Sequence, residues 1–294
     1  MDPLLVIANA GAGTADALDP ALKVLRAHGE VEVARPDGPD DLDGVLDTAG
    51  DRTLVMAGGD GSVQLTVATL HRRGELGDHT LALLPLGTGN DVARGLGLPL
   101  DPVEAAHVVV TGRRRPMDLL VDDTGRVVVN SVHAGAGATA ARAGESWKRR
   151  LGRAGYAVGA LLTAVGLADD GPPAVRLRVE VDGEVVHEGD VLQVAVGNGS
   201  SVGGGTELTP DANFSDGLAD VMVSLAAGPL ARFGYVLDLV RRRHHERHDV
   251  LTRRGRHVVV SGEEFWCSAD GETHGPQTRR AWRVEPGAYE LVVP

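Results

Sequence analysis

The first half of the chain alternates short apolar runs with segments of helical periodicity. The runs are almost continuously apolar, as in strands buried on both faces, whereas apolar residues in the intervening segments recur every three or four positions. This alternation predicts a doubly wound α/β domain, with a mostly parallel sheet and helices on both faces. The predicted strands are residues 4–10, 31–34, 53–59 and 80–87, and the predicted helices are 17–29, 40–50, 62–74 and 90–97.

The pattern changes near residue 117, where strand-like runs follow one another around polar turns. Residues 175–198 predict a hairpin with Asp182-Gly183 as its tight turn. We therefore expect a C-terminal antiparallel β-sandwich, interrupted by two helical segments. The other predicted strands fall within 117–132, 219–225, 257–262 and 289–294, and the helical segments within about 144–168 and 228–247. The predicted domains are 1–117 and 118–283, with a last strand, 284–294, that could return to the first.

Composition narrows the class of protein. The net charge of −12 argues against a broad nucleic-acid surface. The single Cys267 excludes an internal disulfide and fits a reducing cytoplasm. We expect neither a transmembrane helix nor a signal peptide, because no apolar run reaches 18 residues and the first residues lack a basic stretch. The expected location is therefore the cytoplasm.

Basic residues cluster in the second half, at 148–153, 241–248 and 253–256. Such clusters are usually a solvated face, but they could also meet an anionic membrane surface. The sequence leaves both alternatives open.

Three glycine-rich loops follow strands of the predicted parallel sheet: ANAGAGT (8–14), GGDGS (58–62) and PLGTGND (85–91). Glycines let backbone N–H groups face anionic oxygens, and the helix that follows adds the positive end of its dipole. Tight turns also need glycine, but three such loops at one sheet edge favour a nucleotide phosphate site. The chain has no G-x-x-x-x-G-K-[ST] motif, and GAGTAD is a poor match to the dinucleotide fingerprint.

GGDGS followed by PLGTGNDVAR (85–94) resembles the catalytic domain of the diacylglycerol kinase family, which includes bacterial lipid kinases and sphingosine kinases. The resemblance covers nearly the whole chain in the family's order. The further matching segments are ANAGAG (8–13), VVVNSVHAGAGA (127–138), RLGRAGYAVGAL (150–161), the segment from Gly197 to Val223 with its GGG and SDGL motifs, and SADGE (268–272).

The resemblance implies ATP at the loops of the first domain and a lipid alcohol received by the β-sandwich. It implies that the nucleotide contacts Asn9, Gly11, Gly13, Gly58, Gly59, Gly61, Ser62, Thr88, Gly89 and Asn90. The physics of phosphoryl transfer agrees, since Mg²⁺ is held by one or two carboxylates together with phosphate oxygens.

The same resemblance assigns roles to acidic residues. Glu272 would take the proton from the lipid hydroxyl, and Asp60 and Asp118 would organise a catalytic Mg²⁺. Asp216, with the Leu218 carbonyl, matches a second metal position. The structural alternatives are a helix N-cap for Asp60 and ordinary turns for Asp216 and Glu272.

The chain departs from the family pattern in two loops. Ala10 and Ala12 replace the usual Pro and Ser of the first loop, and Gln64 and Leu65 follow where a Glu is expected after GGDGS. The main expectation is an ATP-dependent lipid kinase acting on a diacylglycerol-like alcohol. A kinase of a soluble substrate and a nucleotide-binding regulator remain alternatives, because NAD kinases and phosphofructokinases share the GGDG loop. The lipid, a homodimer and peripheral contact with the inner membrane face are left open.

Overall fold

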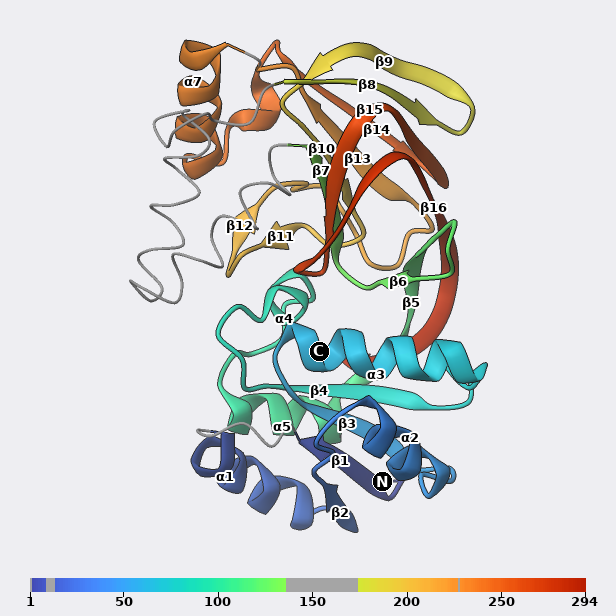
Figure 1. The fold of residues 1–294 in the computed structure, drawn as a ribbon. Coiled ribbons are helices and arrows are strands. Elements are labelled where there is room, and N and C mark those ends of the chain that lie inside the picture. The colour runs from blue at the N-terminus through green and yellow to red at the C-terminus, as the bar shows by residue number, and fades with distance from the viewer. Residues whose placement is uncertain (1, 9–13, 136–173, 227) are drawn as a thin grey trace.

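The first half of the chain folds into parallel strands with helices on both faces in the computed structural model (Figure 1). The structure describes residues 2–8, 14–135, 174–226 and 228–294. β1 (Leu4–Ala8) lies between β2 (Val31–Ala34) and β3 (Thr53–Gly58), and β3 pairs with β4 (Thr80–Pro85), all in parallel. The four predicted strands are therefore confirmed.

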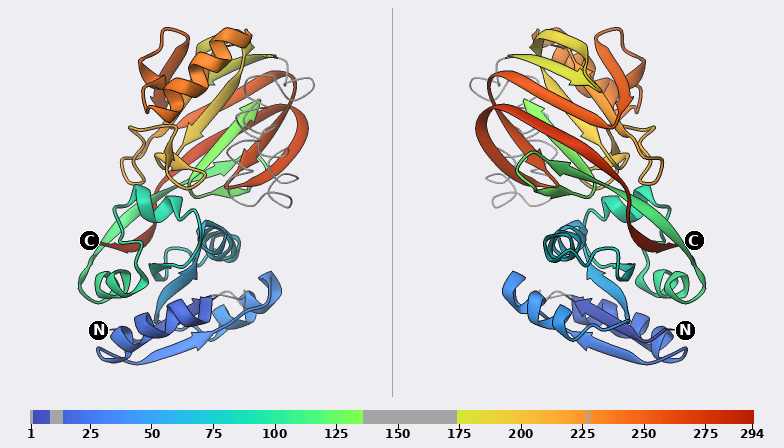
Figure 2. Two further views of the ribbon diagram at one scale, coloured as in Figure 1. Left: turned by 90° about the vertical axis from the view of Figure 1, so that its left-hand side faces the viewer. Right: turned by 90° about the vertical axis from the view of Figure 1, so that its right-hand side faces the viewer.

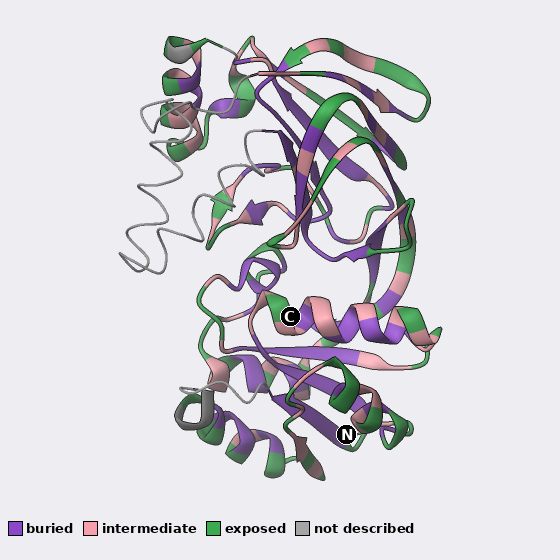
Figure 3. Cartoon of the chain, in the orientation of Figure 1, coloured by how far each residue is buried: buried purple, intermediate pink, exposed green. Residues whose placement is uncertain are grey.

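Successive residues of β1 pack into two different cores. Leu5 and Ile7 join a cluster with α2 (Pro39–Asp47) and α3 (Asp60–Arg73), whereas Leu4 and Val6 join a cluster with α1 (Thr14–Arg26) and α5 (Pro102–Thr111). Because both faces of the sheet are covered, β1 is apolar at every position, whereas β2 at the sheet edge carries Glu32 and is only partly buried. Figure 3 shows β1, β3 and β4 as mostly buried.

The second half is antiparallel, as its pattern predicts. Asp182 and Gly183, both with positive φ, form the tight turn between β8 and β9. A separate core of mostly β-branched and aromatic side chains fills this part, and Figure 2 shows its strands standing above the parallel sheet. The strands are β5 (Arg113–Asp122), β6 (Val127–Val128), β7 (Ser131–Gly135), β8 (Val175–Val181), β9 (Glu184–Val191), β10 (Gln193–Gly197), β11 (Ser201–Val202), β12 (Thr206–Glu207), β13 (Ala219–Ser224), β14 (Val250–Gly255), β15 (His257–Ala269) and β16 (Glu272–Val293).

β16 belongs to both halves. Its first part pairs with β15, and its last part pairs in parallel with β4 through Glu290 and Leu291. β5 runs antiparallel beside β16. The predicted boundaries at residues 117 and 283 thus fall inside two strands that run continuously between the halves. The junction between the halves is therefore part of one hydrogen-bonded sheet.

Several elements differ from the sequence expectations. α5 was not predicted, although Asp101 caps it by accepting hydrogen bonds from the N–H groups of Val103 and Glu104. β14 was also missed. The segment 228–247 divides into α7 (Pro229–Val240) and a short 3₁₀ helix, η1 (His244–Glu246), and α4 is only Asp91–Gly95. The predicted helix at 144–168 lies outside the described residues. Within the described ranges, no helix is both long and apolar enough to cross a bilayer.

Candidate active site

The loops after β3 and β4 lie directly against each other. The N–H of Leu86 donates to the carbonyl of Gly58 at 2.9 Å. A Cβ added to Gly87 would lie 2.4 Å from the Cα of Gly59, and one added to Gly59 would lie 3.0 Å from the Cα of Gly87. This close approach explains two of the glycines by packing. By contrast, a Cβ on Gly61 would meet nothing within 4 Å, so Gly61 stays available to a ligand.

Asn90 closes its own loop. It adopts φ 51°, its Oδ1 accepts a hydrogen bond from the N–H of Gly87 at 3.0 Å, and its Nδ2 donates to the Gly87 carbonyl at 2.9 Å. These bonds give Asn90 a role in the shape of the loop, and its contact with the nucleotide stays a prediction. Thr88 is exposed and Ser62 half-buried. Ser62 packs on Gly58, where a Cβ would lie 2.2 Å from its Oγ.

Asp60 is the first residue of α3 and reaches across to α4. Its Oδ1 accepts a hydrogen bond from the N–H of Val92 at 3.0 Å, and the N-cap position of α3 belongs to Gly59. Its Oδ2 faces Gly89, where a Cβ would lie 3.0 Å from this oxygen and 3.5 Å from Oδ2 of Asp91. The side chain therefore links two loops and does not cap its own helix. Its position in the first turn of α3 suits a negative charge.

Asp91 is an acid that the sequence analysis did not select. It is buried, its Oδ1 accepts from the N–H of Gly205 at 2.7 Å, and its Oδ2 accepts from that of Gly204 at 2.9 Å. Burial raises the pKa of Asp91, and the nearby charge of Asp60 adds to this effect. Gly203, Gly204 and Gly205 all have positive φ, so the GGG segment folds over Asp91 in a conformation that favours glycine.

Asp270 is the second acid that was missed. At the tip between β15 and β16, its Oδ2 accepts from the N–H of Val129 at 2.6 Å, and its Oδ1 accepts from those of Asn130 at 2.9 Å and Ser131 at 3.1 Å. Desolvation raises the pKa of Asp270 to about 6, against the lowering effect of these amides, and Asp60 raises it further. Asp60 is thus an electrostatic neighbour of both Asp91 and Asp270. The SADGE motif was the available signal.

Glu272 begins β16, two residues beyond Asp270. Its side chain is 67% exposed and its Oε2 lies 3.8 Å from Nε2 of His274. No hydrogen bond within the described ranges fixes it. The predicted role of Glu272 as proton acceptor stays a prediction, with Asp270 as a more enclosed carboxylate close by.

Asp118 lies buried on β5 at the junction of the two halves. Its Oδ2 accepts from the N–H of Gly217 at 2.6 Å and its Oδ1 accepts from that of Gly287 at 2.9 Å. Both oxygens therefore fix backbone turns. Its predicted role toward the catalytic magnesium stays a prediction, and the contacts present give it a positioning role.

Asp216 contacts a guanidinium group at the predicted second metal position. Its Oδ2 accepts a hydrogen bond from Nη2 of Arg254, whose Nε also donates to Oδ2 of Asp220 at 3.1 Å. Its Oδ1 accepts from the N–H of Leu218 at 3.1 Å. Positive charge is already supplied here by Arg254. Both oxygens of Asp216 therefore have partners that compete with a divalent ion, and the metal role of Asp216 and of the Leu218 carbonyl stays a prediction.

Asp60 fits a magnesium ion better. Its Oδ2 accepts no hydrogen bond from the described residues and points to the space shared with Asp91. Among the residues that the structure describes, no three His, Cys, Asp or Glu side chains form a group that could hold a metal ion. Catalytic magnesium needs only one or two carboxylates when phosphate oxygens complete its shell. Asn9, Gly11 and Gly13 of the first loop, together with the basic cluster 148–153, lie outside the described residues.

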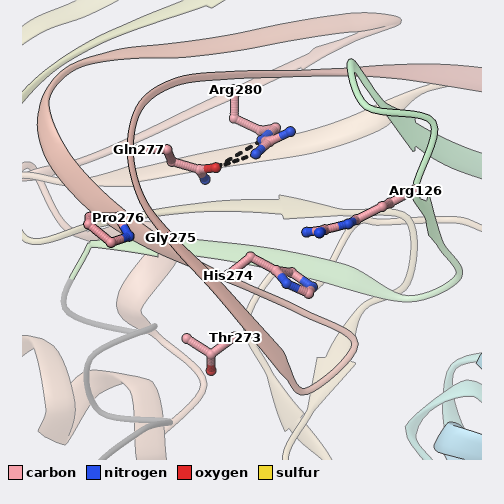
Figure 4. A pocket seen from close by; sticks show the side chains of 7 residues that line it. All are labelled: Arg126, Thr273, His274, Gly275, Pro276, Gln277 and Arg280. Atoms are coloured by element: carbon pink, nitrogen blue, oxygen red, sulfur yellow. Dashed lines mark hydrogen bonds between the residues drawn. The ribbon is translucent and has the colours of Figure 1, made fainter.

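A hollow of about 460 Å³ opens beside Glu272 on the second half. Figure 4 shows the side chains of Arg126 and His274 extending into it and Arg280 bonded to Gln277. Its lining is mostly polar and it is widely open to solvent. The lining residues are Arg126, Thr273, His274, Gly275, Pro276, Gln277 and Arg280.

Sequence comparisons identify relatives for both halves. Residues 3–121 match the diacylglycerol kinase catalytic domain, and residues 130–293 match the YegS C-terminal NAD kinase beta sandwich-like domain. A probable lipid kinase YegS-like protein of Stenotrophomonas maltophilia is 31% identical over 82% of this chain and 78% of its own length. One of Serratia proteamaculans is 35% identical over 59% of this chain, and the match spans 55% of the relative's length.

Solved structures share the fold. A putative diacylglycerol kinase from Bacillus anthracis superposes with a TM-score of 0.81 at 23% identity, over 100% of this chain and 97% of that one. An NAD kinase from Archaeoglobus fulgidus, solved in complex with ATP, superposes with a TM-score of 0.55 at 13% identity, over 98% of this chain and 93% of that one. The predicted α/β and β-sandwich fold class is confirmed. With matching models over both halves and a relative aligned along most of its length, the chain belongs to the diacylglycerol kinase catalytic-domain family, together with the proteins named probable lipid kinase YegS-like.

Proposed function

We propose that this protein is an ATP-dependent lipid kinase that phosphorylates the hydroxyl group of a diacylglycerol-like lipid. The observation that carries the proposal is the position of Asp60 and Asp91 in two glycine loops at the carboxyl ends of the parallel strands β3 and β4, with Asp270 of the β15–β16 tip as an electrostatic neighbour of Asp60. In open α/β sheets ligands bind at this edge. The first turn of α3 offers backbone N–H groups and a positive dipole end to phosphate oxygens.

The transfer exchanges one phosphorus–oxygen bond for another. The lipid hydroxyl oxygen forms a bond to the γ-phosphorus, the bond from this phosphorus to the β–γ bridging oxygen breaks, and ADP leaves. The hydroxyl proton passes to a carboxylate at the β15–β16 tip, either Glu272 or Asp270. A base is most effective when its pKa lies near the working pH, and burial has moved the pKa of Asp270 to about 6.

The remaining residues position these groups. Asp91 holds the GGG segment of the second half against the glycine loop after β4, and Asp270 fixes the β15–β16 tip to the 129–131 backbone within the second half. Asp60 would hold Mg²⁺, which, when bound, offsets charge on the phosphate oxygens. Without such a cation, a carboxylate at this place would repel ATP.

A substrate panel tests the acceptor class. Purified protein is incubated with γ-labelled ATP, Mg²⁺ and either diacylglycerol in mixed micelles or NAD⁺, and labelled products are separated. We expect label in the lipid, and its loss by about 100-fold or more in Glu272→Gln or Asp270→Asn. Glu264→Gln, an exposed acid on β15, is the matched control. Label in NAD⁺ alone, or ATP binding without transfer to any acceptor, would contradict the proposal.

The second candidate, a nucleotide-binding regulator, has one observation in its favour. Leu65 stands at the position where the family pattern has an acid. It packs against the core cluster between the parallel sheet and the helices α2 and α3. The helix after the GGDG loop therefore contributes no second carboxylate there. The same panel separates the candidates, because a regulator binds ATP and transfers nothing.

A further inference from the structure

Helix α7 exposes an apolar stripe. Large exposed hydrophobic residues in the described ranges number six, and four of them lie on this helix: Leu230 is 89% exposed, Phe233 55%, Leu237 38% and Val240 75%. Their spacing of three and four residues places all four on one side of the helix. The stripe therefore runs along the whole element.

The opposite side of α7 holds the helix to the protein. Tyr235 is buried and its hydroxyl accepts a hydrogen bond from Nε2 of Gln193 at 2.7 Å. Ala231, Val236 and Leu239 pack with it against a small core that includes Met222. Because the inner side of α7 is packed and hydrogen-bonded, the exposure of the outer stripe does not come from a loosely packed helix. Figure 1 places α7 at the outer edge of the second half, away from the parallel sheet, and Figure 3 shows exposed residues along it.

A basic run follows directly at the end of the stripe. Arg241, Arg242 and Arg243 are all exposed. Arg242 pairs with Glu207 and Arg243 with Glu246, each at 2.9 Å, and exposed pairs of this kind exchange readily with other anions. Arg241 makes no side-chain hydrogen bond or ion pair within the part of the chain that the structure describes. This basic run contrasts with the net charge of −12 of the chain.

We infer that α7 is a membrane-docking helix that lays Leu230, Phe233, Leu237 and Val240 into the surface of an anionic bilayer, with Arg241–Arg243 at the lipid phosphates. An apolar helix face beside arginines is the pattern of helices that lie in the membrane interface. The stripe extends over the eleven residues from Leu230 to Val240, about 15 Å of helix. Four side chains fall short of the roughly 800 Å² per partner that a stable protein interface buries, which favours a bilayer over a second copy of the chain.

The inference adds to the proposed function, because a lipid alcohol reaches a kinase from a bilayer. Vesicle binding is measured without ATP or Mg²⁺, and phosphoryl transfer is measured separately in detergent micelles. Loss of one therefore leaves the other intact, and the two proposals fail independently.

Co-sedimentation with extruded vesicles tests the docking helix. We expect the protein to bind phosphatidylcholine vesicles that contain an equal amount of phosphatidylglycerol more tightly than vesicles of phosphatidylcholine alone. The double variant Leu230→Gln, Phe233→Gln should bind about tenfold or more weakly. Arg241→Gln should lose about fivefold on the anionic vesicles only. The matched control is Leu100→Gln, Val185→Gln, which removes two exposed apolar residues elsewhere and should bind like the wild type.

A fluorescence variant gives a second readout that does not depend on affinity. The emission of Phe233→Trp should shift to shorter wavelength with anionic vesicles, and that of Val185→Trp should not. No vesicle binding by the wild type, or equal binding by the Leu230→Gln, Phe233→Gln variant, would overturn the inference. So would a wild-type dimer in sedimentation velocity that this variant converts to a monomer, since the stripe would then join two copies.

Discussion

At the scale of single residues, the acids at the junction differ in what their oxygens contact. Both oxygens of Asp118 accept backbone amides, whereas Asp60 commits one oxygen to Val92 and leaves the other toward the space beside Asp91. The first arrangement holds the fold and the second leaves a ligand position for a cation. The two residues should therefore respond differently to the same substitution.

Asp60→Asn should impair transfer and leave the fold intact. Asn retains an oxygen for the N–H of Val92 but removes the negative charge, so the Mg²⁺ concentration needed for half-maximal activity should rise and kcat should fall by about 100-fold. Thermal unfolding should change little. A magnesium titration of transfer checks this. An unchanged magnesium dependence would contradict a cation role for Asp60.

Asp118→Asn should destabilise the protein. An amide offers one acceptor oxygen where two are used, so either the buried N–H of Gly217 or the more exposed N–H of Gly287 loses its partner, and the loss at Gly217 would cost about 1–3 kcal/mol. Denaturant unfolding measures this cost. Asp51→Asn, at an exposed acid without a side-chain partner among the described residues, is the control. A full loss of activity with no change in the free energy of unfolding would instead support the predicted magnesium role of Asp118.

Arg254→Met should let a metal ion bind at the position that the guanidinium of Arg254 now occupies. Removing the guanidinium leaves Asp216 and Asp220 unpaired and close together, and we expect a loss of about 1 kcal/mol in stability. Added Mg²⁺ or Ca²⁺ should then raise the Tm of the variant. When Arg254 is retained, Asp216→Asn should respond to these ions as the wild type does, with the same change in Tm. A wild-type metal effect that disappears in Asp216→Asn would show that a metal binds there despite Arg254.

At the scale of elements, the two glycine loops after β3 and β4 act as one unit. Leu86 bonds to Gly58, and Gly59 meets Gly87 backbone to backbone. A loop pair of this kind fixes the start of α3 relative to α4, and with it the distance between Asp60 and Asp91. The glycines thus have two separable reasons to be there, close packing and access for a ligand.

Gly87→Ala and Gly61→Ala separate these reasons. A Cβ on Gly87 would lie 2.4 Å from the Cα of Gly59, which is too close, so the loops must move apart at a cost of about 1–3 kcal/mol. Gly61 has free space and a helical position, so Gly61→Ala should keep or slightly raise the stability. Thermal denaturation of both variants checks this. Equal effects on Tm would contradict the loop contact.

The local pattern of apolar and polar residues predicts most helices and strands, but few of the contacts between them. Continuous apolar runs predicted β1 to β4 because both faces of the sheet are covered. The sequence pattern does not predict α5 as a helix, because its Val108–Val110 run resembles a strand. Asp101 and Pro102 are nevertheless typical of a helix start. β14 carries Thr252, Arg253 and Arg254 and lacks an apolar pattern.

The candidate site was only partly predictable for a different reason. Asp60 stands in a motif that a reader can recognise, but Asp91 and Asp270 become neighbours of Asp60 only through the tertiary fold. The pairing of Asp216 with Arg254 joins residues that lie 38 positions apart. The motifs predict which residue type stands at each position. The hydrogen-bond and ion-pair partners of that residue depend on the tertiary fold.

At the scale of the whole molecule, β16 and β5 tie the two halves together. β16 pairs with β15 in one half and β4 in the other, and its first residues carry the Asp270–Glu272 tip toward the glycine loops after β3 and β4. The site is therefore assembled from both halves, and α7 lies at the far edge of the second. A lipid bound by the second half and a nucleotide bound by the first would meet at the acids of the junction.

The most direct measurement is single-turnover transfer of labelled phosphate from ATP to diacylglycerol in micelles, compared between the wild type, Glu272→Gln, Asp270→Asn and the control Glu264→Gln. The Tm of each protein is measured alongside, because Asp270 also holds three backbone amides. We expect labelled lipid from the wild type and Glu264→Gln at similar rates, and a rate lower by about 100-fold or more in Glu272→Gln or in Asp270→Asn while that variant is still folded. Equal rates in all four proteins, or no labelled lipid from the folded wild type, would contradict a lipid kinase centre at this junction.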